Sequence, residues 1–315
     1  VTNYVPTSYK GLTTLRDAII DSNNIVAVKA ITALTPQVGF DFLQKLGFTT
    51  LVNNRVNTNG AYESDVNQSL SLGGITDGVT NVELTAAYAA IANQGTYNKP
   101  VLYTTVKDSN GNVLLSNKTS SQKVMKKSTA WLLTNAMEDV IKKGTGREAQ
   151  LDSDMAAAGK TGTTSNNYDY WFCGYTPYYT ASVWTGYDYN TSFDNDKDYH
   201  KVIWKKIMDR IIKETKQSVK SFPACKSIKK ASICMKSGKK PLPDICAKDP
   251  QKSMVRTEYF ASGTVPKDSC DAHVAVTFCS KSHLAAQKFC PEKFRYTKIF
   301  RCLLYTSPSP RDSTS

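Results

Sequence analysis

The sequence predicts an α+β fold, in which helices pack against an antiparallel sheet, followed by a basic tail that contains cysteines. Three observations lead to this prediction. Apolar residues recur at helical spacing in several segments between residues 13 and 212, and three strand-like segments follow one another closely between residues 155 and 187. Charge and cysteine content both change near residue 200. With 315 residues, 40% of them hydrophobic, the chain can form one large or two smaller domains.

The helices are predicted from the spacing of apolar residues. Residues 13–34 have this spacing, with an interruption at the Asp-Ser-Asn-Asn turn of residues 21–24. Glycines at positions 47 and 95 follow two further segments, as is typical of helix ends. These further helices are predicted at residues 35–46, 82–93, 129–142 and 200–212.

The strands are predicted from short apolar runs and the turns between them. Asn110-Gly111 between residues 101–107 and 113–116 is a strong hairpin signal. Three more strands are predicted at residues 155–163, 170–176 and 179–187. The connection between the last two is so short that they must pair antiparallel.

The charge distribution predicts a boundary near residue 200. Residues 1–196 carry 15 Lys+Arg and 17 Asp+Glu, whereas residues 197–301 carry 24 and 9. The simplest interpretation of the basic part is a solvated, lysine-rich appendage. The alternative is attraction to an anionic polymer, which would weaken as salt rises. No recognition motif supports nucleic acid as the partner.

Seven of the eight cysteines lie after residue 200, six of them in this basic part. Their clustering in a polar, core-poor segment favours disulfides and an oxidising compartment, whereas Cys173 is expected to be a buried free thiol. Cys270-x-x-His273 with Cys279-x-x-x-His283 has the spacing of metal ligands. Because no tight Cys-x-x-Cys pair is present, disulfides are the favoured interpretation, and we assign neither a metal nor a cofactor.

Composition divides the tail into three parts. Residues 215–253 are rich in Lys, Ser and Pro and are predicted to form a linker, and residues 254–301 a small cysteine-containing module. Residues 302–315 resemble translated sequencing-adapter sequence and are set aside as non-native. No run reaches the roughly 18 apolar residues of a membrane helix, and no signal peptide opens the chain, so we expect a soluble piece of a longer protein.

Two motifs carry the functional signal. Lys160-Thr161-Gly162-Thr163 lies at the end of a predicted strand, and Ser22-Asn23-Asn24 lies in the turn near the start of the chain. With the segments at residues 82–95 and 144–146, they resemble the third and second motifs of penicillin-binding proteins, more specifically of the bifunctional class A type. The resemblance covers residues 1–214, read as a partial transpeptidase domain with the fold shared by serine β-lactamases.

The first motif of that family, Ser-x-x-Lys, does not precede Ser22. Three such strings begin at positions 120, 227 and 237, but all follow Ser22 in polar surroundings and are interpreted as chance matches. The expectation is therefore a C-terminal fragment that lacks its nucleophile and is inactive alone.

The resemblance implies serine acyl transfer on a peptidoglycan stem peptide ending in D-Ala-D-Ala, and binding of β-lactams. Ser22 would pass a proton to the leaving amine, Asn24 would order the site, and Lys160 would supply positive charge. Thr161 and Thr163 would bind the substrate carboxylate, and Gly162 would leave room for the substrate backbone. The whole protein would act at the outer face of the cytoplasmic membrane.

Each motif also has a simpler explanation. Ser22-Asn23-Asn24 could be a helix-capping turn, Lys160 a charge that protects an edge strand, and Gly162 a bulge. Their order and separation favour the joint, catalytic interpretation. Three functional alternatives stay open: a D,D-carboxypeptidase, a β-lactamase of the same fold, or a non-catalytic module that binds anionic wall polymers through the basic tail.

Overall fold

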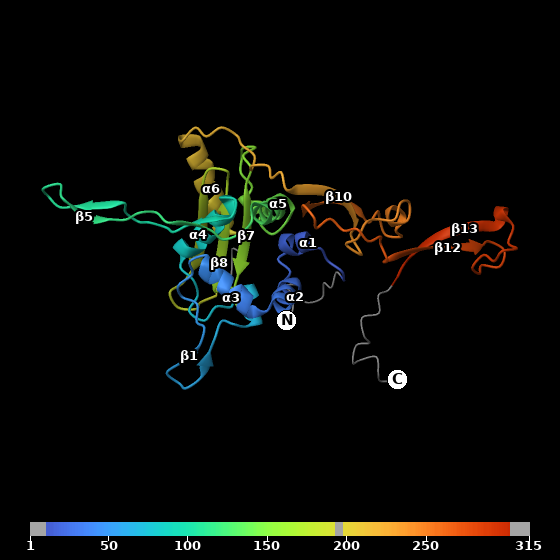
Figure 1. Ribbon diagram of the computed structural model, residues 1–315, viewed down its shortest axis with the longest axis horizontal. Helices are drawn as coiled ribbons and strands as arrows, with labels where there is room; N and C mark the ends of the chain where they lie inside the picture. The colour runs from blue at the N-terminus through green and yellow to red at the C-terminus, as the bar shows by residue number, and fades with distance from the viewer. Residues whose placement is uncertain (1–10, 193–197, 303–315) are drawn as a thin grey trace. The chain divides into compact units, whose positions relative to one another are not determined.

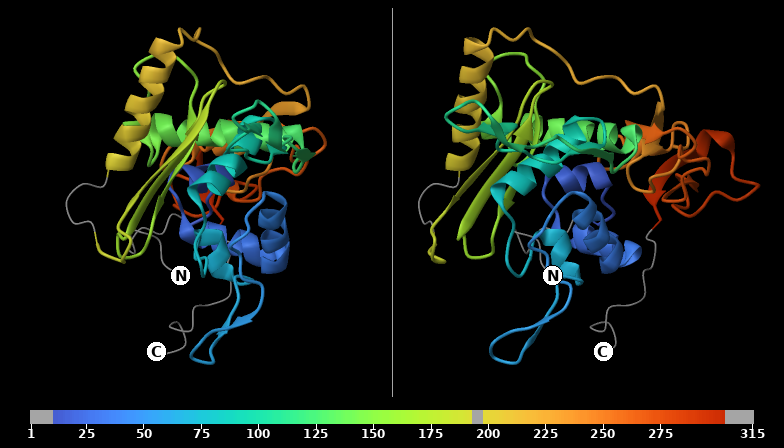
Figure 2. Two further views of the ribbon diagram at one scale, coloured as in Figure 1. Left: turned by 90° about the vertical axis from the view of Figure 1, so that its left-hand side faces the viewer. Right: turned by 60° about the vertical axis from the view of Figure 1, so that its left-hand side comes forward.

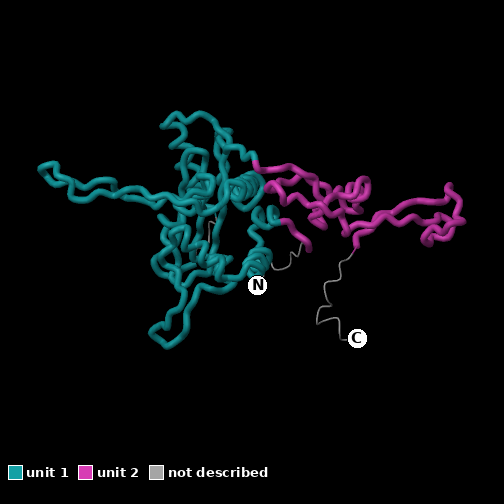
Figure 3. Tube along the Cα trace, viewed as in Figure 1, with its two compact units in different colours: residues 1–9, 15–226 teal, residues 10–14, 227–315 magenta. Residues whose placement is uncertain are grey.

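The computed structural model describes residues 11–192 and 198–302. The chain divides into two compact units (Figure 3). The first unit comprises residues 1–9 and 15–226, and the second comprises residues 10–14 and 227–315. Most of the adapter-like segment, residues 303–315, lies outside the described residues.

A three-stranded antiparallel sheet organises the first unit (Figure 1). Strand β8 (Asp169–Tyr175) lies between β7 (Ala158–Thr163) and β9 (Thr180–Gly186). The three predicted strands and their antiparallel pairing are confirmed, although β7 begins three residues later than predicted. Because β7 is the edge strand of this sheet, one side of the Lys160 motif has no strand partner among the described residues.

Every predicted helix is present in the first unit, within a few residues of its expected bounds. The interruption at residues 21–24 separates two helices, as the turn residues predicted. The α-helices are α1 (Leu15–Ile20), α2 (Asn24–Leu34), α3 (Pro36–Lys45), α4 (Asn81–Ala92), α5 (Lys127–Lys143) and α6 (Tyr199–Glu214). Two short 3-10 helices are η1 (Gln68–Leu72) and η2 (Arg147–Ala149).

Helices cover both faces of the sheet because side chains alternate along β8. On one face, the Phe172 ring meets the Trp204 ring of α6 edge-on, with centroids 5.1 Å apart. On the other face, Tyr175 is fully buried among residues of α1, α4 and α5, and its hydroxyl hydrogen-bonds that of Thr134 at 2.8 Å. Helices α6 and α4 therefore lie on opposite sides of the sheet (Figure 2). This confirms the α+β class.

The remaining strands of the first unit form small two-stranded sheets. The hairpin predicted from Asn110-Gly111 is present, and Gly111 has the positive φ (85°) that such a turn requires. The first strand of that hairpin is shorter than predicted. The pairs are β1 (Arg55–Val56) with β2 (Tyr62–Glu63), β3 (Thr96–Asn98) with β6 (Ser121–Lys123), and β4 (Thr105–Lys107) with β5 (Val113–Ser116).

Helices α2 and α3 pack against η1 around Ile31, Phe40 and Leu70. Among the described residues, no single helix is long and apolar enough to cross a membrane. Taken together, α2 and α3 reach the required length and composition, but the pair is bent by 93°.

The second unit contains two antiparallel hairpin-like pairs. Strand β10 (Ile228–Cys234) pairs with β11 (Val255–Ala261), and β12 (His273–Cys279) pairs with β13 (Arg295–Arg301). Two short 3-10 helices, η3 (Cys246–Lys248) and η4 (Glu292–Phe294), lie in the connections. The buried cluster of this unit consists of three cysteines with Met254 and Ala272.

Two expectations about the tail differ from the structure. Residues 215–253 were expected to be a linker, but they contain β10 and η3, because β10 gains its partner only from β11, beyond the segment. Disulfides were expected, but none joins the cysteines of the described residues. The free thiols of Cys234, Cys246 and Cys270 are brought together in the buried cluster described above, which is an arrangement that cysteine counting does not reveal.

Candidate active site

The turn between α1 and α2 leaves the Ser22 hydroxyl available. Asn23 caps α2, because its side chain accepts a hydrogen bond from the backbone amide of Val26 at 3.0 Å. Ser22 has φ of 53°, a left-handed conformation that is uncommon for residues other than glycine. The capping explanation therefore applies to Asn23, whereas Ser22 has a different partner.

That partner is Lys160, which is 138 positions away in the sequence. The Lys160 ammonium donates a hydrogen bond to the Ser22 hydroxyl oxygen at 2.7 Å and a second one to the Thr161 carbonyl oxygen at 3.0 Å. A lysine that only protects an edge strand would extend into solvent. Lys160 is instead half-buried and faces the serine turn.

The environment of Lys160 changes its acidity. Burial lowers the pKa of the ammonium to about 8, with Cys173, its cross-strand partner in β8, acting in the opposite direction. Burial also raises the pKa of the Cys173 thiol to about 12, so that thiol is neutral at physiological pH. An amine with a pKa of about 8 can both give and accept a proton near neutral pH.

Ser22 and Lys160 face a cleft of about 470 Å³, a size that suits a short peptide or a small molecule. Residues of α1, α2, η1, α4 and β7 line it. All six residues selected from the sequence are among them: Ser22, Asn24, Lys160, Thr161, Gly162 and Thr163. The fold thus brings two distant motifs to one cavity.

The threonines of β7 provide hydroxyl groups along the edge of the cleft. The Thr161 hydroxyl hydrogen-bonds the Thr145 hydroxyl at 2.8 Å, and Thr163 is exposed. Since a hydroxyl has one proton and two lone pairs, Thr161 can accept from Thr145 while donating to a ligand. A Cβ atom on Gly162 would lie 3.3 Å from the Trp171 Cβ, so the neighbouring strand already restricts this position.

Some residues in the cleft or in contact with its wall were not selected from the sequence. Thr145, which hydrogen-bonds Thr161, follows α5 within Gly144-Thr145-Gly146, a segment that signalled the approach to the lysine motif but not a contact with it. Tyr88 of α4 and Ser71 and Leu72 at η1 line the cleft itself. No local pattern marks the η1 residues, because only the packing of α2 and α3 brings them there.

Known proteins resemble this chain in sequence. The model of the penicillin-binding protein transpeptidase domain matches residues 2–212, and that of the penicillin-binding protein 1A C-terminal domain matches residues 224–275. Penicillin-binding protein 1A of Clostridium novyi is 32% identical over 95% of this chain, and that of Clostridium tetani 32% over 86%. The chain spans about a third of the length of these relatives, 34% in both cases.

Solved structures show the same fold. Penicillin-binding protein 1A from Haemophilus influenzae aligns with a TM-score of 0.66 and 20% identity, covering 86% of this chain and 43% of its own. PonA1 from Mycobacterium tuberculosis, solved in complex with penicillin V, aligns with a TM-score of 0.59 and 26% identity, covering 70% and 62%. The chain therefore belongs to the penicillin-binding protein transpeptidase family, with relatives in the class A group of penicillin-binding protein 1A.

Proposed function

We propose that this chain carries the second and third active-site motifs of a D,D-transpeptidase that crosslinks peptidoglycan stem peptides. The observation that supports this most strongly is the 2.7 Å hydrogen bond from Lys160 to Ser22 at the wall of the cleft. The parent protein acts at the outer face of the cytoplasmic membrane.

In the first half-reaction, the hydroxyl oxygen of a serine nucleophile attacks the penultimate D-Ala carbonyl, and the bond to the terminal D-Ala nitrogen breaks. The lysine of the Ser-x-x-Lys motif takes the proton of the nucleophile. The Ser22 hydroxyl donates a proton to the leaving amine and is reprotonated through Lys160, which regains the proton that the nucleophile released. Asn24, at the first turn of α2, orients the stem peptide from the same wall of the cleft. The positive charge of Lys160 favours the neutral form of the lysine that activates the nucleophile.

The threonine hydroxyls of β7 recognise the terminal carboxylate. Thr163 donates directly, and Thr161 donates while it accepts from Thr145. The substrate backbone lies along the free edge of β7, as an added strand. In the second half-reaction, an amine from a neighbouring stem attacks the acyl-enzyme ester, and the nucleophile leaves with its proton restored.

The nucleophile belongs to a Ser-x-x-Lys motif, and none precedes Ser22 in the printed sequence. Of the later strings, the one at Ser120–Lys123 includes the exposed strand β6. We therefore expect no covalent adduct when this chain is incubated with a fluorescent penicillin. A stable adduct should form when a Ser-x-x-Lys segment of a relative is joined in front of residue 1.

Two variants of the joined protein sharpen the test. Lys160→Met should slow acylation by about 10²–10⁴-fold, the usual contribution of a proton-transfer group. Lys123→Met, in the exposed string, should leave acylation unchanged. Labelling of the chain alone, or equal effects of the two variants, would contradict the proposal. Rapid release of the adduct by water would instead favour a carboxypeptidase or a β-lactamase.

A further inference from the structure

The second unit contains a cluster that the transpeptidase reaction does not use. The side chains of Cys234, Cys246, Cys270 and His273 converge, and their ligand atoms all lie within 4.8 Å of one another. All four residues are buried, with exposed fractions between 0% and 6%. We propose that these residues bind one Zn²⁺ ion in a structural Cys₃His site.

The separations match tetrahedral coordination. Zn–S bonds of about 2.3 Å and a Zn–N bond of about 2.0 Å place sulfur and nitrogen ligands about 3.5 Å apart and two sulfurs about 3.8 Å apart. The Sγ atoms of Cys234 and Cys270 each lie 3.4 Å from Nδ1 of His273. Cys246 completes the set from the start of η3. Four ligands of this type leave no open position, as is typical of structural rather than catalytic zinc.

The second nitrogen of the histidine is held as metal-bound imidazoles usually are. Nε2 of His273 lies 2.8 Å from a carboxylate oxygen of Asp249, and both side chains are completely buried. This contact assigns the proton to Nε2 and leaves the Nδ1 lone pair directed at the sulfurs. Asp249 in turn accepts hydrogen bonds from Nε and Nη2 of Arg301, each at 2.5 Å.

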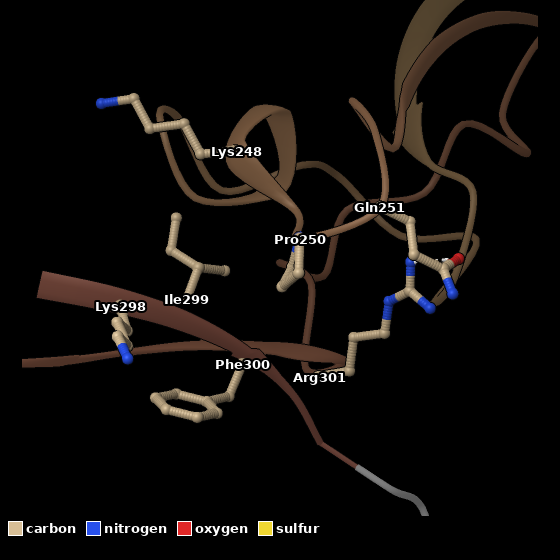
Figure 4. Close-up of a pocket in the computed structure, with 7 residues that line it drawn as sticks. All are labelled: Lys248, Pro250, Gln251, Lys298, Ile299, Phe300 and Arg301. Carbon is tan, nitrogen blue, oxygen red and sulfur yellow. Dashed lines mark hydrogen bonds between the residues drawn. The ribbon is translucent and has the colours of Figure 1, made fainter.

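Arg301 is itself anchored on its other side. Its guanidinium also donates to the Gln251 side-chain oxygen at 2.8 Å, and Figure 4 shows the two side chains directed at each other at the edge of a surface pocket. The chain from His273 through Asp249 to Arg301 connects the cluster to the end of β13. A buried histidine that merely fills a core does not require such an arrangement.

The backbone around the cysteines is shaped to surround sulfur ligands. The amide of Leu242 donates a hydrogen bond to the Cys246 sulfur at 3.3 Å. Gly238, with φ of 69°, closes the turn after Cys234 through a hydrogen bond from its amide to the Cys234 carbonyl at 2.8 Å. Such amide–sulfur contacts stabilise thiolates, the form in which cysteine binds zinc.

The small core of this unit also favours a metal. Apart from the cysteines, its buried cluster contains Met254 and Ala272, with the partly buried Met235, Leu242 and Val255 packed against it. Units this small usually need disulfides or a metal for stability, and the cysteines here are free. One disulfide among three cysteines would leave the third thiol buried without a partner. Binding of Zn²⁺ uses all three, with release of their three thiol protons.

The test is metal analysis of the complete 315-residue chain, purified with reductant and without chelator. We expect about one zinc per chain, and after exchange with Co²⁺ the visible absorption of a tetrahedral thiolate site. Cys270→Ser and His273→Ala should lose the metal. The matched controls Cys279→Ser and His283→Ala, which alter the residues with metal-like spacing outside the cluster, should keep it.

Two further variants protect the test against simple misfolding. Cys270→His keeps a zinc ligand at that position and should retain the metal and the cobalt spectrum. Asp249→Asn should weaken zinc binding by about 10–100-fold in competition with a chelator. Asp271→Asn, which removes only a surface ion pair with Lys239, should have no effect.

The outcomes separate the zinc site from its rivals. Absence of metal from the reduced chain, or loss of metal in the Cys279→Ser or His283→Ala controls, would overturn the proposal. It would also be overturned by a disulfide between any two of Cys234, Cys246 and Cys270, detected by mass spectrometry of the exported protein after alkylation under native conditions. The zinc site would be established if the wild type and Cys270→His retain zinc while Cys270→Ser and His273→Ala lose it.

Discussion

In the first unit, large apolar side chains such as Trp204, Tyr175 and Phe40 fill the interior, and the functional polar groups lie at the wall of an open cleft. In the second unit the polar and sulfur groups themselves form the interior, and few apolar residues accompany them. The comparison suggests that the first unit is stable through packing, whereas the second depends on what its cysteines bind.

The largest expected difference between the two units is their response to removal of the metal. We expect a strong chelator to abolish hydrogen-exchange protection of β10 and β11 while the amides of β8 keep theirs. Structural zinc contributes about 10–16 kcal/mol of apparent binding free energy in zinc-finger peptides, so its loss exceeds the stability of a small unit. Equal loss of protection in both units, or none in either, would refute this contrast.

Truncation of the largest fully buried side chain should destabilise the first unit and leave the second unit unaffected. Trp204→Ala removes the ring that packs on Phe172, and we expect it to lower the free energy of unfolding of the first unit by about 3–5 kcal/mol. Urea denaturation followed by the fluorescence of the remaining tryptophans measures this. The zinc content should be unchanged, and a variant that lost zinc would show that the two interiors are coupled.

A helix cap in the first unit tests a purely local interaction. Asn23→Ala removes the acceptor for the Val26 amide and should cost about 1 kcal/mol of unfolding free energy, whereas Asn23→Asp keeps an acceptor and should cost less. Urea denaturation of the two variants measures the difference. An equal cost would mean that Asn23 acts through something other than the cap.

The last test is the dependence of stability on pH. Burial lowers the pKa of Lys160 to about 8 from an ordinary value of 10.5, so between these values the unfolded chain binds more protons than the folded one. The contribution of Lys160 to the free energy of unfolding therefore rises as pH increases from about 8 to 10.5. The difference between the wild type and Lys160→Met, measured by denaturation across this range, should show the rise. A flat difference would mean that burial does not perturb the lysine.

Sequence patterns were most informative where one short segment contains all the residues that determine its structure. The Asn110-Gly111 hairpin and the strands around Lys160 follow from turn residues and alternation, which are local properties. Cys234, Cys246 and Cys270 are separated by loops of different length, so spacing could not group them. The spacing pointed to Cys270 and His273, which belong to the cluster, and to Cys279 and His283, which lie outside it.

By itself, the sequence determined the α+β class, the bounds of most helices and strands, and the family, because periodicity and short motifs survive without knowledge of contacts. Only the tertiary structure decided that Lys160 reaches Ser22, that Thr145 supports Thr161, and that three cysteines surround one histidine nitrogen. These contacts join residues distant in sequence, and their geometry depends on how strands pair and loops return, which no local pattern encodes.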